Sequence, residues 1–258
     1  FTTATSAYNT AVGYSAGVAI TTGIQNTLIG AIAGDALTDA DYNVAVGVTA
    51  LGGDTKGNNS TAIGYSALVA QNFTTSTDSF NTAVGYEAGG AVTTGIQNTL
   101  IGSRAGDALT DADYNTAVGM GALGSDTLGS YSTAIGRNAL YSQNFTTATN
   151  SLNTAVGYAA GEGITTGTSN TLVGSGAGDA LTVGNSNVVV GTLALTADTK
   201  GDRNIAIGAN ALEVQNFTTS TDSYNTAVGH AAGASVTTGI NNTLIGGLAG
   251  DGLTDADN

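Results

Sequence analysis

The sequence contains no cysteine and no proline, and only five of its 258 residues are basic. Without cysteine it has neither a disulfide framework nor a thiolate metal site. Nineteen acidic residues outweigh the basic ones and give a formal net charge of −14. Such a chain cannot neutralise a phosphate backbone, which excludes nucleic acid as a partner. The same balance disfavours binding to an anionic membrane surface.

Long apolar runs and a catalytic constellation are missing as well. No stretch of 18 or more apolar residues is present, so the sequence predicts no membrane-spanning helix. His230 is the only histidine, and it stands where the sister segments carry Tyr14, Tyr86 and Tyr158. We expect it to be an exposed surface residue. A histidine-based triad or zinc centre needs further partners that this chain lacks, so we expect no enzymatic activity.

What the sequence does have is a repeat within a repeat. NTAVGYSAG at Asn9 returns in closely similar form at Asn81, Asn153 and Asn225, 72 residues apart each time. Each period divides into three coils of 17 residues and a fourth of 21, and each coil begins with [N/S]-x-x-[V/I]-G. The coils start at residues 9, 26, 43, 60, 81, 98, 115, 132, 153, 170, 187, 204, 225 and 242.

Numbering each coil from its Asn or Ser as position 1 shows which positions are fixed. Position 4 is always Val or Ile, position 5 is always Gly and position 8 is always Ala. Position 9 follows the order Gly, Gly, Leu, Leu through each set of four coils. Seventeen residues are too few for a helical repeat, and a β-branched core that ends in Gly is typical of a short strand entering a turn.

The sequence therefore predicts an all-β fold, a parallel β-solenoid or β-roll in which each coil stacks about 4.8 Å from the next. Gly at position 5 would form a corner with positive φ, and Ala at position 8 would fill a cramped inside corner. We expect residues 1–258 to form a single solenoid segment. Because the sequence begins inside a long coil, at Phe1, we expect it to belong to a longer repeat array.

Stacked coils place the asparagines at position 1 above one another, where amide side chains can bond along the stack. We expect a structural ladder that fixes the register, with a row of ligand-binding side chains as the alternative. The predicted ladder residues are Asn9, Asn26, Asn43, Asn81, Asn98 and Asn115.

Alternation along the strand places positions 2 and 4 on one face and positions 1, 3 and 5 on the other. Both faces tend to be apolar, as Val44, Ala45 and Val46 illustrate. A single solenoid buries only one of them. The second face either contacts another chain or is an exposed strand of β-branched residues, and the sequence leaves both interpretations open.

Acidic clusters recur in the turns, and two interpretations of them remain. Hard cations such as Ca²⁺ bind clustered carboxylates, which makes calcium the one candidate cofactor. The third copy, GDALTVGNSN, keeps Asp179 and loses the other two acids, which favours solubilising charge instead. The calcium candidates are Asp35, Asp39 and Asp41 in the first copy and Asp107, Asp111 and Asp113 in the second.

The four additional residues of every fourth coil belong to loops that contain NFTT. We expect these loops to protrude. Phe73, Phe145 and Phe217 either fold back onto the solenoid or offer an exposed aromatic ring to a carbohydrate or protein.

STAIGYSA at Ser60 and NIAIGANA at Asn204 resemble the YadA-like head repeats of trimeric autotransporter adhesins. They are also similar to NTAxGYxAG arrays of bacterial and phage tail-fibre-like proteins. The resemblance implies a left-handed β-roll and a homotrimer packed along the roll faces. It also implies an extracellular location, on a cell surface or in a virion fibre.

We therefore expect a non-enzymatic structural rod of an adhesin, surface fibre or phage tail fibre, which provides stiffness, reach and multivalent display. The alternative is a binding module that recognises glycan, or ice, through a regular face or the NFTT loops. The expected partners are further copies of the chain, in a homotrimer or filament, and a host-surface glycan or protein.

Overall fold

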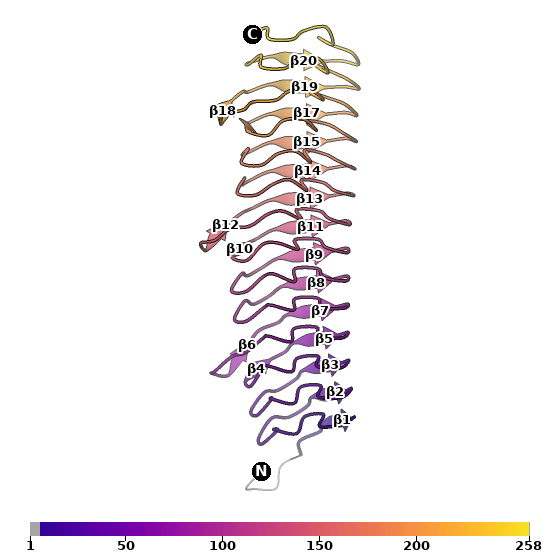
Figure 1. The fold of residues 1–258 in the computed structure, drawn as a ribbon, viewed down its shortest axis with the longest axis vertical. Helices are drawn as coiled ribbons and strands as arrows, with labels where there is room; N and C mark the ends of the chain where they lie inside the picture. Colours follow the sequence, from indigo (N-terminus) through magenta and orange to yellow (C-terminus); the bar gives the residue numbers. More distant parts are fainter. Residues whose placement is uncertain (1–5, 258) are drawn as a thin grey trace. The chain divides into compact units, whose positions relative to one another are not determined.

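The computed structural model describes residues 6–257, which form a parallel β-solenoid of about fourteen turns with about 17 residues per turn (Figure 1). The described residues contain short strands and turns and no helix. The predicted fold class is thereby confirmed. Its left-handed sense remains a prediction from the resemblance.

The chain divides into two compact units. Unit 1 comprises Phe1–Ser130 with Thr146–Ala148, and unit 2 comprises Tyr131–Phe145 with Thr149–Asn258. Both are built from the same coil, and each is described by itself below. That residues 1–258 form one segment of a longer array remains a prediction.

In unit 1 the main sheet has the order β1-β2-β3-β5-β7-β8-β9. Its strands are β1 (Thr10–Val12), β2 (Thr27–Ile29), β3 (Val44–Val46), β5 (Thr61–Ile63), β7 (Thr82–Val84), β8 (Thr99–Ile101) and β9 (Thr116–Val118). A small second sheet pairs β4 (Gly57–Asn58) with β6 (Thr77–Asp78), and β10 (Gly129–Ser130) follows.

In unit 2 the main sheet has the order β11-β13-β14-β15-β17-β19-β20. Its strands are β11 (Thr133–Ile135), β13 (Thr154–Val156), β14 (Thr171–Val173), β15 (Val188–Val190), β17 (Ile205–Ile207), β19 (Thr226–Val228) and β20 (Thr243–Ile245). The second sheet pairs β16 (Gly201–Asp202) with β18 (Thr221–Asp222), and β12 (Thr149–Asn150) lies between β11 and β13 in the chain.

The strand register follows the repeat. Thr10 of β1 pairs with Thr27 of β2, and across the longer coil Thr61 of β5 pairs with Thr82 of β7, always in parallel. Position 2 thus lies beside position 2 in neighbouring coils, whether the coil has 17 residues or 21. The predicted coil alignment is confirmed.

The core of each unit is a narrow column of small and medium side chains. Position 3 of the strands points inward, and Leu28, Ala45 and Ala62 are fully buried there. Ala33 and Ala50, at position 8, are fully buried too, as the sequence predicts. Positions 2 and 4 point outward and are half-buried or exposed. In the main-sheet strands from β2 to β19, one face therefore packs inside its own coil and the other is half-buried or exposed.

Glycine at position 5 ends each strand because the next coil passes too close for a side chain. Gly30 has a φ of 136°, and a Cβ placed on it would lie 2.5 Å from the carbonyl oxygen of Gly47 in the next coil. L side chains rarely adopt that φ, and the contact is with rigid backbone. The predicted positive-φ corner is confirmed.

Glycine at position 9 leaves room for a leucine. Gly34 has a φ of 54°, and a Cβ on it would approach Leu37 Cδ1 to 2.7 Å and Leu28 Cδ2 to 2.8 Å. Leu37 stands at position 12 of the same coil and is fully buried. In the first two coils of a set, position 12 therefore supplies the apolar side chain.

In the third and fourth coils of a set the assignment is reversed. Leu51 and Leu68 occupy position 9 and are fully buried, whereas position 12 carries the polar residues Asp54 and Gln71. The apolar side chain thus moves from position 12 to position 9 halfway through the set. This exchange is the physical reason for the Gly, Gly, Leu, Leu order in the sequence.

Candidate functional site

The asparagines of position 1 form a buried ladder. The backbone N–H of Asn26 donates to Asn9 Oδ1 at 2.8 Å, and that of Asn43 donates to Asn26 Oδ1 at 3.0 Å. Asn26 Nδ2 also donates to the carbonyl oxygen of Ala40 at 2.7 Å, which ties it to the closing turn of its own coil. Each side chain therefore joins its coil to the next and closes its own coil.

The same bonds recur in the second set, where Asn98 donates to Asn81 and Asn115 donates to Asn98. All six predicted ladder residues thus lie where the sequence places them, and all but Asn9, which is half-buried, are buried. A buried amide whose oxygen and nitrogen are both bonded cannot also present itself to a ligand. The structure supports the ladder and not the ligand-binding row.

A second ladder, missed by the sequence analysis, lies at position 16. The N–H of Ile24 donates to Asp41 Oδ1 at 2.7 Å, and the N–H of Asp41 donates to Asn58 Oδ1 at 2.9 Å. Ile96 and Asp113 repeat the first of these bonds at 2.7 Å. Here the acceptor belongs to the later coil, whereas in the asparagine ladder it belongs to the earlier one. The first three coils of a set are therefore joined by side-chain bonds of opposite direction.

This second ladder explains the acidic clusters. Asp41 and Asp113 accept backbone N–H groups of the preceding coil. Asp39 accepts the hydroxyl of Thr22, and Asp111 accepts that of Thr94 at 2.5 Å. The two aspartates of each turn therefore contact separate partners on the coil before, so they clamp coils together.

The structure does not gather the calcium candidates into a site. Among residues 6–257 no group of three or more Asp, Glu, His or Cys side chains could hold a metal ion. Asp35 and Asp107 lie half-buried on position 10, away from the clamp. In the third copy Asn185 takes the place of Asp41 and still accepts the N–H of Thr168, at 2.8 Å, so the charge is dispensable there.

Burial raises the pKa of two of these carboxyl groups. It raises the pKa of Asp107, while its own backbone N–H and Arg104 oppose the rise. It also raises the pKa of Asp113, where the N–H of Ile96 opposes it. Desolvation penalises the charged form and donated hydrogen bonds favour it, and in both groups desolvation wins.

A third feature, also missed, anchors the protruding loops. Asp54 is fully buried at position 12; its Oδ1 accepts the N–H groups of Gly57 at 3.0 Å and Phe73 at 3.1 Å, and its Oδ2 accepts Gln71 Nε2 at 2.6 Å. One carboxylate thus holds its own turn and the start of the loop. The repeated D-T-K/L-G at Asp54, Asp126 and Asp198 is the sequence signal that marks it.

Asp198 repeats this anchor in unit 2, with Gly201 at 3.0 Å, Phe217 at 3.1 Å and Gln215 at 2.7 Å. Burial raises the pKa of Asp198, against the hydrogen bonds from Gln215 and three backbone N–H groups.

The loop phenylalanines are buried. Phe73, Phe145 and Phe217 are 5%, 6% and 6% exposed. Phe73 packs against Gly57, where an added Cβ would lie 2.8 Å from Phe73 Cδ2. Of the two alternatives that the sequence left open, the structure shows the ring folded back. The exposed-aromatic alternative is wrong, because the carboxylate that bonds the phenylalanine N–H also fixes the loop against the core.

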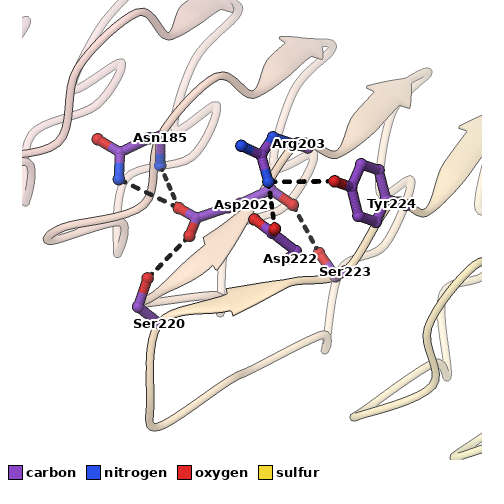
Figure 2. A network of polar contacts seen from close by, with 7 residues as sticks. All are labelled: Asn185, Asp202, Arg203, Ser220, Asp222, Ser223 and Tyr224. Atoms are coloured by element: carbon purple, nitrogen blue, oxygen red, sulfur yellow. Dashed lines mark hydrogen bonds and ion pairs between the residues drawn. The ribbon is translucent and has the colours of Figure 1, made fainter.

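The long coil that starts at Asn204 has a polar network of its own with the coils before it (Figure 2). Asp202 accepts the N–H of Asn185 at 2.6 Å and the hydroxyl of Ser220 at 2.8 Å. Arg203 forms an ion pair with Asp222 and donates to Tyr224 Oη at 3.1 Å. In unit 1 the corresponding positions use Asn58, which donates to Ser76 and Asp78. The network holds the loop to the preceding coil with different residues in each unit.

The remaining surface feature is the outward strand face, which we define as positions 2 and 4 together with position 6 and the residue before position 1. Ile63, Ile101 and Ile205 at 38%, 39% and 37% exposure are typical of its middle. Aromatic side chains flank it: the rings of Tyr65 and Tyr86 stack with centroids 5.4 Å apart. His230 also lies on this face and is exposed, as predicted.

Comparison with models of known protein families, with curated proteins and with solved structures gives no match. The class is therefore defined by the fold, a repeat protein built as a parallel β-solenoid. Residues 6–257 include no helix that is long and apolar enough to span a membrane.

Proposed function

We propose that this chain is a non-enzymatic structural segment of an extracellular fibre, either an adhesin, another surface fibre or a phage tail fibre. One observation carries the proposal. The polar side chains best suited to bind a ligand or to catalyse a reaction form hydrogen bonds between adjacent coils instead. They are the asparagines of position 1 and the aspartates of positions 12, 14 and 16.

The mechanism that follows is mechanical. Adjacent coils are bonded by a parallel backbone ladder, and the first three coils of a set are also bonded by two side-chain ladders of opposite direction. In such a repeat every coil contacts only its neighbours, so reach grows with the number of coils while the local structure stays the same. Identical surface positions then recur along the stack, and this repetition provides multivalent display.

The location and the assembly rest on the resemblance to YadA-like head repeats. That resemblance supports an extracellular place, on a cell surface or virion, and a homotrimer or filament. Host glycan or protein is the expected target of the complete fibre.

The alternative function is recognition of glycan, or of ice, by a regular face. The buried phenylalanines remove the aromatic contact that the loops would have offered. The threonine file at position 2 is interrupted by Val44, Val188 and Ile205. The mechanical role therefore has more support than either form of recognition.

Immunogold electron microscopy of the native source tests the proposal. Antibodies raised against the purified chain are expected to label filamentous appendages on cells or virions. Label confined to the interior of cells, with none on an appendage, would contradict it. Binding of the purified chain to a glycan array or to ice, abolished by replacing outward threonines, would favour the alternative.

A further inference from the structure

The sequence departs from its own repeat at three places in two adjacent coils of unit 1. In the first coil of a set, position 7 is Ser or Ala except at Glu87, and position 10 carries a side chain except at Gly90. In the second coil of a set, position 7 is uncharged except at Arg104. Stacking does not require these three residues, because the sister coils stack without them. They therefore point to a local role.

The departures surround a hollow in the surface. It has a volume of about 310 Å³ and is lined by Ser66, Val69, Glu87, Gly90, Ala91 and Asp107. The turn does not need a glycine at Gly90, whose φ is not positive, and the nearest atom that a Cβ would meet is the carbonyl oxygen of Glu87 at 3.3 Å. The sister coils carry Val18, Glu162 and Ala234 at this position. Glycine here leaves open a space that a side chain would fill.

Asp107 is a half-buried carboxylate on the wall of this hollow. It stands at position 10 between Gly90 and Gly124 of the neighbouring coils, so neither neighbour offers it a side chain. Within residues 6–257 no ion pair involves Asp107, and its own backbone N–H donates to its carboxylate. Asp179, at the same position of the third set, instead accepts the hydroxyl of Thr196 at 2.5 Å. Burial raises the pKa of Asp107, which shows that its charge is not fully compensated.

The two other charged residues set the net charge beside the hollow. Arg104 Nε donates to Glu87 Oε2 at 2.9 Å, and the guanidinium lies over the ring of Tyr86, 5.8 Å from its centroid. The charges of Glu87 and Arg104 cancel, so Asp107 leaves one net negative charge. Both residues act on Asp107, Glu87 by repulsion and Arg104 by attraction. One further positive charge in the hollow would complete the neutralisation.

A single ammonium group on an apolar stem matches this arrangement. An ionised carboxylate only accepts hydrogen bonds, whereas an ammonium group only donates them and has three N–H groups. Asp107, Glu87 and the hydroxyl of Ser66 are acceptors on the wall of the hollow. Val69 and Ala91 supply apolar surface for methylene groups, which lysine side chains commonly bury. A metal ion fits less well, because residues 6–257 contain no group of three potential metal ligands.

From the hollow and its unpaired carboxylate we infer that this site binds the alkylammonium side chain of a lysine from a protein partner. The inference goes beyond the proposed structural function and does not rest on it. Asp107 accepts the ammonium group, Glu87 and Ser66 supply further acceptors, and Gly90 leaves room for the stem. Arg104 repels a second positive charge, which selects a monoamine over a diamine.

Isothermal titration calorimetry of purified residues 1–258 with butylammonium chloride, which reproduces the lysine side chain, tests the inference. We expect saturable binding with a dissociation constant of about 1 mM, a free energy of about 4 kcal/mol. Binding is expected to weaken as salt screens the charges. Butan-1-ol, which has the same stem without the charge, is expected not to bind. Putrescine, a diamine of the same length, is expected to bind more weakly than butylammonium.

Two substitutions disable the site, and each has a matched control. Asp107→Asn keeps the shape and removes the charge, and Asp35→Asn is its control at the same half-buried position of the first set. Gly90→Val fills the hollow with the side chain that Val18 carries in the sister coil, and Ala234→Val is its control in the fourth set. We expect each site variant to bind butylammonium about 10-fold more weakly and each control to bind like the parent.

A parent that gives no saturable binding would overturn the inference. So would equal losses in Asp107→Asn and Asp35→Asn, since general attraction to the net charge of −14 would then account for the binding. Putrescine that binds more tightly than butylammonium would reject lysine as the ligand. Circular dichroism that matches the parent verifies folding of the variants. Asp107→Asn, which preserves volume, keeps the test decisive if Gly90→Val does not fold.

Discussion

Among the individual residues described, Asn204 is the exception to a well-bonded core. Its Nδ2 is buried without a hydrogen-bond partner, and it stands where the other long coils carry Ser60 and Ser132. In unit 1, Gln71 Nε2 donates to Ser60 Oγ at 2.9 Å, so the smaller residue leaves no unbonded donor. An unpaired buried donor costs about 1–3 kcal/mol.

We therefore expect Asn204→Ser to raise the free energy of unfolding by about 1 kcal/mol, because the unpaired amide is removed. Urea denaturation measures the change. The reverse substitution in the sister coil, Ser60→Asn, is the control and is expected to lower stability. Equal effects of the two substitutions, in either direction, would show that the amide carries no such cost.

The buried carboxyl groups predict a dependence on pH. Burial raises the pKa of Asp198, Asp107 and Asp113 in the folded state above the unfolded value of about 3.9. The stability contributed by a group with a raised pKa is fully present below the unfolded pKa and is lost as pH rises through the folded pKa. We expect the melting temperature to increase as pH falls from 7 towards about 4. A steady decrease over that window would contradict the sign.

At the scale of the coil, the repeat predicted the features that depend on one residue type recurring at the same position of every coil. Gly30 at the corner, Ala33 inside it and the register of the strands all follow from a pattern that recurs in every coil. The repeat did not predict the second ladder, because the role of Asp41 is to accept the N–H of Ile24 in the coil before it. The same holds for Asp54, whose partners Gln71 and Phe73 belong to the next coil. In both cases different residue types at the same position of adjacent coils contact each other, so no residue recurs in every coil to mark the contact in the sequence.

The corner glycine makes the sharpest prediction for an element. In Gly30→Ala the new Cβ would meet the carbonyl oxygen of Gly47 at 2.5 Å and force a φ of 136° on alanine. We expect a loss of about 3 kcal/mol in the free energy of unfolding, measured by chemical denaturation. Gly252→Ala is the control, since a Cβ there meets nothing within 4 Å, and it is expected to be neutral.

For the molecule as a whole, the distribution of the acidic residues predicts that calcium does not change the thermal stability. Asp39 and Asp41 are bonded to the coil before them, and the described residues hold no group of three potential metal ligands. We expect a chelator to leave the melting temperature unchanged. A fall of many degrees would contradict this, because an ion that binds only the folded state stabilises it by mass action.

The set of four coils predicts which deletions unit 2 tolerates. Removal of residues 153–224 brings Asn225 to the place of Asn153, and both donate to an equivalent glutamine, Gln215 at 2.8 Å and Gln143 at 2.9 Å. We expect this variant to melt near the temperature of the parent. Removal of residues 170–224 is out of phase, because it replaces Leu172 by Ala227 beside Gly161.

A Cβ on Gly161 would lie 2.5 Å from Leu172 Cδ1, so the out-of-phase deletion leaves a cavity there. Leucine-to-alanine cavities cost about 2–5 kcal/mol. Calorimetry of the two variants separates the outcomes. Equal melting temperatures would show that the order of coils within a set is immaterial.

The exchange of the apolar side chain between positions 9 and 12 also limits how the length of the gene can change during evolution. Genes with tandem repeats lengthen and shorten when copies misalign during recombination. A crossover that joins unlike coils would encode a chain with a hole or a clash inside, and selection would remove it. Related genes should therefore differ by whole multiples of 72 codons, each adding about 19 Å of stacked coils. A lineage could then adjust its reach in discrete steps without altering any contact within a set.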